Sequence, residues 1–128
     1  MLKVERWKKG RGVLPTRAAT FFLHRKFSLL EGWSCLLEGD VEGKQVDLLL
    51  HDSSGRRIGM EVAYSIDHEV FNARHCLKHV DRHVVVCTSK KSLEGVEKRF
   101  KECSDLVSGK VEVLVLSRAL GSWIPGEE

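Results

Sequence analysis

Two carboxylates interrupt apolar segments that have the pattern of β-strands. Asp47 lies within the run 46–50, and Glu61 lies within the run 59–63. Because side chains alternate between the two faces of a strand, both carboxylates project from one side of the sheet if the two strands pair as a hairpin. A divalent cation prefers oxygen ligands and would offset the cost of burying these charges. The pair predicts a metal site; the alternatives are a solvated face or ion pairs with nearby basic side chains.

A second group of polar residues shares one stripe of a predicted helix. His68, Asn72, His75 and His79 are spaced by three or four residues, so they face the same way. His75 and His79 have the spacing of a zinc-chelating pair, but no third ligand lies where it would complete the site. We expect this stripe to be the polar, outward face of the helix, with zinc binding as an alternative. A further alternative is a functional face of this helix, on which Asn72, Arg74, His75 and Lys78 contact phosphates, or Asn72 and His75 reach the acidic site from the side.

Hydrophobic periodicity places these residues in an α/β domain. Apolar residues spaced by three and four predict helices, and short apolar runs divided by Gly, Asp and Ser turns predict an antiparallel meander. The predicted order is α-β-β-β-α-β-α-β, in a mixed sheet that extends the meander by two crossover strands. The helices are expected at 16–32, at 68–80 and from Ser92 onward, and the strands at 33–38, 45–51, 57–64, 83–88 and 111–116.

The charge of the chain is unevenly distributed. The chain has 128 residues, enough for one domain. Residues 1–30 hold eight Lys and Arg residues against one acid, a formal charge of +7, whereas residues 31–128 sum to −4. A basic segment on an acidic body predicts a polyanionic partner, because Lys and Arg release counterions from phosphates; the alternative is a solvated basic terminus. We divide the chain into a basic arm (1–15), the α/β domain (16–117) and a tail (118–128).

Cysteine spacing and hydropathy bear on the cellular compartment. The four cysteines have no CxxC spacing, and no apolar run has the length of a signal peptide or a membrane span. We therefore expect reduced thiols, a cytoplasmic protein and no membrane association.

The two carboxylates and their surroundings resemble a known family. Asp47, a turn, and Glu61-Val62-Ala63 in the next strand look like the motif of the PD-(D/E)xK superfamily, which has a restriction-endonuclease-like fold. The likeness covers residues 16–117. A further set of positions is similar to nuclease-like domains appended to DNA-translocating ATPases and other mobile-element proteins. These positions are His24-Arg25, Val46-Asp47, Gly59-Met60-Glu61-Val62, Glu69-x-x-Asn72-x-x-x-Cys76-Leu77 and 81–86.

The resemblance assigns roles to individual residues. Asp47 and Glu61 would hold Mg²⁺ or Mn²⁺, with Glu38 as a third oxygen ligand, and the ion would polarise a phosphate and activate an attacking water. His24 would border the site as a proton carrier or a phosphate donor. Ala63 stands where the motif has a lysine that stabilises charge on the phosphate. Another element would have to supply this cation, and the candidates are Lys44, Arg74 and Lys78.

The resemblance implies a DNA-binding domain with a nuclease-like fold and weak or absent catalysis. One alternative is a Mg²⁺- or Mn²⁺-dependent endodeoxyribonuclease that uses Asp47 and Glu61. Another is a protein-interaction module of a mobile-element ATPase or of a larger parent protein. The side chains expected to contact DNA are Lys8, Lys9, Arg11, Arg17, Arg25, Lys26, Asn72, Arg74 and Lys78.

Overall fold

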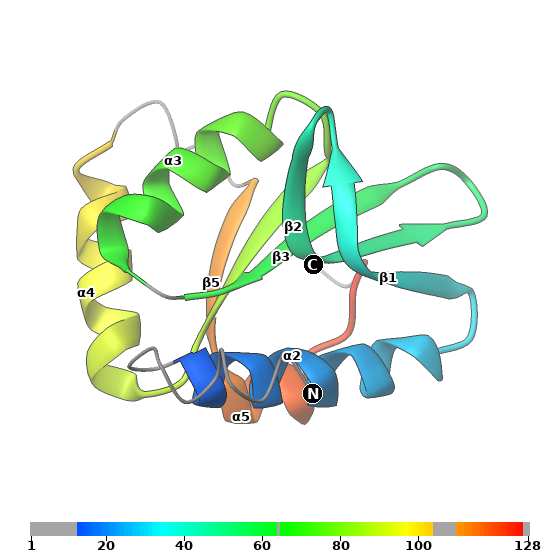
Figure 1. Cartoon of the computed structure of the whole chain (residues 1–128), viewed down its shortest axis with the longest axis horizontal. Helices are drawn as coiled ribbons and strands as arrows, with labels where there is room; N and C mark the ends of the chain where they lie inside the picture. Colours follow the sequence, from blue (N-terminus) through cyan, green and yellow to red (C-terminus); the bar gives the residue numbers. More distant parts are fainter. Residues whose placement is uncertain (1–12, 64, 104–109, 127–128) are drawn as a thin grey trace.

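A five-stranded sheet forms the centre of the molecule, with helices on both faces (Figure 1). Helices α2 (Val13–Ser28) and α5 (Leu116–Leu120) cover one face, and α3 (Ile66–Cys76) and α4 (Lys90–Lys101) cover the other. The computed structural model describes residues 13–63, 65–103 and 110–126.

The sheet is mixed, as the sequence predicts. Its strands follow the order of the chain, β1-β2-β3-β4-β5. The first three pair antiparallel as a meander, and β4 and β5 each add in parallel after a crossover helix. The predicted α/β class is therefore confirmed, and the elements follow the predicted order as far as β5. The strands are β1 (Trp33–Val41), β2 (Lys44–Asp52), β3 (Arg57–Val62), β4 (Arg82–Cys87) and β5 (Val111–Val115).

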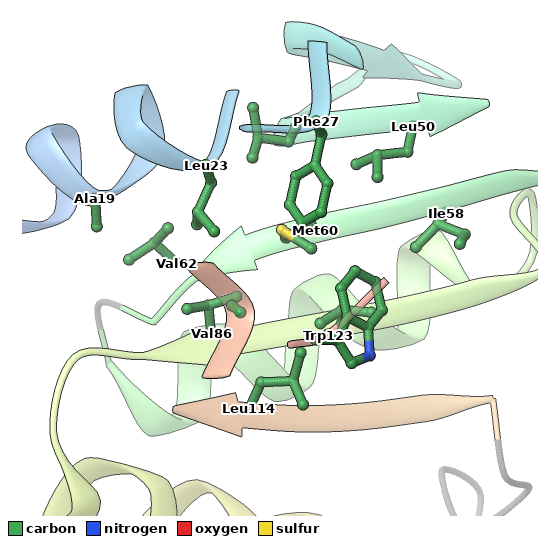
Figure 2. Close-up of a cluster of buried hydrophobic side chains, with 13 residues drawn as sticks. Ala19, Leu23, Phe27, Leu50, Ile58, Met60, Val62, Val86, Leu114 and Trp123 are labelled. Carbon is green, nitrogen blue, oxygen red and sulfur yellow. The ribbon is translucent and has the colours of Figure 1, made fainter. Parts of the chain in front are cut away.

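Alternating side chains of the central strands fill two cores. Val84 and Val86 point to the α2 side, and Val85 and Cys87 point to the α3–α4 side. This accounts for the unbroken β-branched run of β4, which is covered by helices on both faces. On the α2 side, the helix contributes a stripe of side chains that face Met60 and its neighbours (Figure 2). This stripe consists of Ala19, Leu23 and Phe27.

Capping side chains fix where the two crossover helices begin. Ser65 and Ser89 are extended N-cap residues whose side chains accept hydrogen bonds from His68 N–H and Ser92 N–H. α4 therefore begins at Lys90, two residues before the expected start. α3 ends at Cys76, four residues before the expected end.

Residues 116–126 pack on the folded domain, although 118–128 was expected to be a tail. α5 follows β5 directly, and Trp123 is 6% exposed in the core, with its ring edge-on to Phe27 at 5.7 Å. Lys26 holds this segment in place from α2. Its ammonium donates to three backbone carbonyls, those of Ala119 (2.7 Å), Gly121 (3.1 Å) and Trp123 (2.6 Å). These bonds give Lys26 a structural role that the sequence does not indicate.

Lys26→Met is expected to lower the free energy of unfolding by about 2 kcal/mol, because it leaves carbonyls at the end of α5 without their charged donor. Thermal unfolding followed by circular dichroism measures this loss. Arg25→Met is the matched control, since Arg25 is an exposed neighbour on the same helix, and it should change stability little. Equal melting temperatures for the two variants would contradict the role of Lys26.

A buried histidine lies at the start of β4. His83 is fully buried opposite Gly59 of β3, and within the described part of the chain neither ring nitrogen has a hydrogen-bond partner. Burial lowers its pKa from 6.5 to about 4. The folded protein therefore holds the neutral imidazole over a pH range in which an unfolded chain would protonate it.

His83 should make the protein acid-sensitive. Because the pKa of His83 is depressed in the folded state, the free energy of unfolding is highest above about pH 6.5. It should fall by about 3 kcal/mol in total as pH drops to about 4, since the unfolded chain gains a proton that the folded protein does not. Urea unfolding across this range should show the loss in the wild type and a flatter profile in His83→Leu. His79→Gln, at an exposed histidine, should keep the wild-type profile. Parallel profiles for wild type and His83→Leu would rule out His83 as the cause.

Candidate functional site

Asp47 and Glu61 meet where the pairing of the central meander ends. The β2–β3 ladder runs as far as Leu48 opposite Met60, so Asp47 and Glu61 occupy the next opposed positions. Asp47 Oδ2 accepts a hydrogen bond from the Val62 N–H at 2.8 Å. The Asp47 and Glu61 side chains are also hydrogen-bonded to each other. The hairpin therefore brings the two carboxyls together on adjacent strands.

Glu61 is held in its protonated form. Its side chain is 7% exposed. Burial raises the pKa of Glu61 from 4.5 to about 10; the charge of Asp47, the hydrogen bond to it and the charge of Glu69 add to the rise, while Lys44 opposes it. Two carboxyls in contact cannot both ionise without a counter-charge. Glu61 therefore keeps its proton and donates it in the hydrogen bond to Asp47.

A cavity of about 200 Å³ opens beside this pair. Residues from the start of α2, from β2 and β3, and from the first turns of α3 line it. Asp47, Glu61 and Glu69 give it three carboxyls, and Arg17 gives it a guanidinium. The lining is Thr16, Arg17, Thr20, Asp47, Glu61, Val62, His68 and Glu69.

Glu69 lines the cavity although it was not expected to take part in the site. It is 1% exposed, and the Ser65 N–H donates to its Oε2 at 3.4 Å. The sequence does carry a signal for its position. Glu69 lies four residues before Ala73 and seven before Cys76, both fully buried, so it belongs to the inward stripe of α3.

The donors of the pair suit a hard divalent cation. Mg²⁺ keeps several waters and commonly binds proteins through one or two carboxylates together with phosphate oxygens, and Asp47 and Glu61 supply such oxygens at the cavity. Among the described residues, no group of three or more His, Cys, Asp or Glu side chains has the arrangement of a metal site. The described residues thus form no closed metal cage, and the oxygens at the cavity are of the kind that bind a cation together with phosphate and water.

Glu38, the expected third metal ligand, forms a salt bridge with Arg17. Its Oε1 lies 3.0 Å from the Arg17 guanidinium nitrogen in a salt bridge. Glu38 has a φ of 55° in the middle of β1, and the ladder to β2 skips it between Leu37 and Gly39. Its skipped partner in this register is Asp47. Glu38, Asp47 and Glu61 therefore stand level on three adjacent strands.

Five further candidates from the N-terminal part of the chain either do not line the cavity or lie outside the described residues. His24 does not line the cavity, and its Nε2 is hydrogen-bonded to Ser28 Oγ at 3.3 Å. Arg25 is exposed on the same helix. Lys8, Lys9 and Arg11 belong to the basic arm, which falls outside the described residues except for 13–15, the first residues of α2.

The polar stripe of α3 does not face solvent as a whole. Asn72 is 2% exposed, so the expectation of an outward position was wrong for this residue, since it lies among the inward residues Glu69, Ala73 and Cys76. His75 Nε2 is hydrogen-bonded to the Val41 carbonyl at 3.0 Å, which ties α3 to the end of β1.

The remaining cations of the expected set have varied surroundings. Arg74 and Lys78 are exposed on α3 and its C-terminal turn, and neither lines the cavity. Lys44 lies over the Phe71 ring, 4.8 Å from its centre. Ala63, at the motif's lysine position, follows β3 and donates its N–H to the Val86 carbonyl.

Comparison with protein-family models, curated proteins and solved structures finds no match to this chain. Within the described residues, none of the helices combines the length and the apolar character needed to cross a membrane.

Glu61→Gln tests the shared proton in metal-free buffer. A raised pKa in the folded state means that the stability of the wild type is full below about pH 4.5 and declines as pH rises toward about 10. The amide is neutral throughout, so the variant should be more stable at neutral pH by about 1–2 kcal/mol, with a difference that grows as pH rises. Differential scanning calorimetry between pH 5 and 9 measures this. Glu42→Gln, at an exposed turn, should show the same dependence of stability on pH as the wild type. If Glu61 were ionised in the folded protein, Glu61→Gln would show that same dependence, which would contradict the shared proton.

Proposed function

We propose that the chain is a DNA-binding domain with a nuclease-like fold of the PD-(D/E)xK type, in which Asp47 and Glu61 bind Mg²⁺ or Mn²⁺. The observation that carries the proposal is the hydrogen-bonded pair of carboxyls on adjacent strands, beside a cavity that also holds Arg17. Buried like-charged groups destabilise a fold unless a partner neutralises them. A site that binds a cation in place of the proton accounts for keeping both acids.

The position of the basic helix supports a phosphate partner. α2 carries Arg17 at the cavity and Arg25 on its exposed surface. A phosphodiester that approaches Arg17 comes close to three carboxyls, and a divalent cation between phosphate and carboxylates removes that repulsion. DNA binding and cation binding are therefore expected to strengthen each other.

The surroundings of Ala63 support weak catalysis. When bound, the cation would supply Lewis-acid activation of the phosphate. The chain itself offers Asp47, oriented by the Val62 N–H, and the proton-bearing Glu61. Ala63 provides no charge to stabilise the phosphate, so hydrolysis depends on a positively charged side chain from another helix or strand. Arg17 in the same cavity is the observation that favours the second candidate, a metal-dependent endodeoxyribonuclease.

Asp47→Asn tests the cation site. Isothermal titration of Mn²⁺ into protein saturated with a short DNA duplex should show at least about tenfold weaker Mn²⁺ binding in the variant, because the amide lacks the charge of the ligand. Asp40→Asn is the control, since Asp40 is exposed on β1, and it should bind Mn²⁺ like the wild type. Unchanged Mn²⁺ affinity in Asp47→Asn would sink the metal site.

DNA binding and cleavage are separated by further measurements on the same proteins. Fluorescence anisotropy with the labelled duplex should show affinity that falls steeply with salt. Nicking of a supercoiled plasmid with Mn²⁺, absent in Asp47→Asn and in Glu61→Gln, would make the protein a nuclease. Salt-dependent binding without nicking fits the DNA-binding domain. No binding to duplex or branched DNA would reject both and leave the protein-interaction module of an ATPase.

A further inference from the structure

Among the Lys and Arg residues in the described part of the chain, Arg17 is the one that lines the carboxylate cavity. Its side chain is 27% exposed, and its guanidinium bonds to Glu38 Oε1 at 3.0 Å. Its guanidinium carbon also lies 5.7 Å from the centre of the Phe21 ring. Arg17 thus stands between the buried acids of the cavity and an acid on a different element, β1.

The backbone of β1 is distorted where it presents Glu38. A φ of 55° places Glu38 in the left-handed region, which costs a residue with a side chain about 1 kcal/mol or more. The next residue, Gly39, packs so closely on β2 that an added Cβ would overlap the Leu49 side chain. This kink interrupts the ladder opposite Asp47 and brings the Glu38 carboxylate to Arg17. Strain retained at this position points to a use for the contact.

The Arg17–Glu38 bridge is exchangeable. Glu38 is 44% exposed, and an ion pair of this kind contributes little to stability. The planar guanidinium matches the paired oxygens of a carboxylate and of a phosphate equally well. A phosphate group that reaches the cavity therefore competes with Glu38 for the same donors.

We propose that Arg17 is the phosphate-binding residue of the cavity and that Glu38 is its internal competitor, which occupies the guanidinium until a phosphate oxyanion displaces it. This inference rests on the proposed function for the source of the phosphate, a DNA backbone. It deepens that function because Arg17 of α2 provides the positively charged side chain that is missing at Ala63. Glu38 then sets a threshold for phosphate binding and is not a metal ligand.

The test compares single and paired variants with two probes, the labelled DNA duplex and inorganic pyrophosphate. Glu38→Gln should tighten the binding of both by about two- to fivefold, the equivalent of an exposed ion pair. Arg17→Ala should weaken both by about tenfold or more. In Arg17→Ala the additional change Glu38→Gln should give no gain, because the competitor then has no guanidinium to occupy.

Matched variants remove the effect of net charge. Asp40→Asn removes a negative charge from β1 as Glu38→Gln does, and Lys98→Ala removes a positive charge from α4 as Arg17→Ala does from α2; Asp40 and Lys98 are exposed, and neither lines the cavity. If Arg17→Ala melts at a much lower temperature than the wild type, Arg17→Lys replaces it, and the loss of the planar fork should still weaken binding. Equal effects within each matched pair would overturn the proposal.

The two probes separate failure of the inference from failure of the proposed function. The Arg17 Nε–H resonance, assigned by comparison with Arg17→Lys, should shift when pyrophosphate is titrated into the wild type and at lower concentrations in Glu38→Gln. If the resonance shifts in this way but the protein binds no DNA, the phosphate site is supported and the proposed function is rejected. If the protein binds DNA and the resonance does not change, the proposed function is supported and the role of Arg17 is rejected.

Discussion

The contact between the Asp47 and Glu61 carboxyls is the interaction on which the rest of the site depends. Two acids in this position can be buried together only if a proton or a cation lies between them. The Val62 N–H fixes Asp47, and burial keeps Glu61 protonated. Glu69 adds a third acid, which raises the cost of ionising Glu61 further. In the proposed metal site, a cation would take the place of this proton and neutralise the two carboxylates.

The ends of the strand ladders determine where this charge is needed. Pairing between β2 and β3 stops at Leu48 and Met60, and the pairing of β1 with β2 skips Glu38. Asp47 therefore lies opposite the skipped position of β1 and next to the end of the ladder with β3. The start of α2 and the first turns of α3 close the gap with Arg17 and Glu69. A site of both charges thus forms where the sheet opens.

Much of this arrangement is predictable from the sequence, because it follows from local periodicity. The alternation of side chains in strands places Asp47 and Glu61 together, and the unbroken run of valines predicts the doubly covered β4. Glu69 was within reach as well, from its spacing to Ala73 and Cys76. Asn72 shows the limit of helical spacing, since a polar residue beside an apolar stripe is placed by the exact rotation of α3, which tertiary packing decides.

What the sequence does not predict depends on contacts between distant segments. The kink at Glu38 lies next to the close approach of Gly39 to Leu49, and the role of Lys26 requires that the α5 segment return to α2.

These contacts change the meaning of the charge distribution. The +7 of residues 1–30 suggests one continuous basic surface, yet Lys26 donates to carbonyls of the α5 segment and Arg17 pairs with Glu38. Of the basic residues on α2, Arg25 is exposed, and Arg17 becomes available when Glu38 is displaced. A charge that is released only at the carboxylate cavity directs a phosphate to that point, which an equally basic but uncommitted helix would not do.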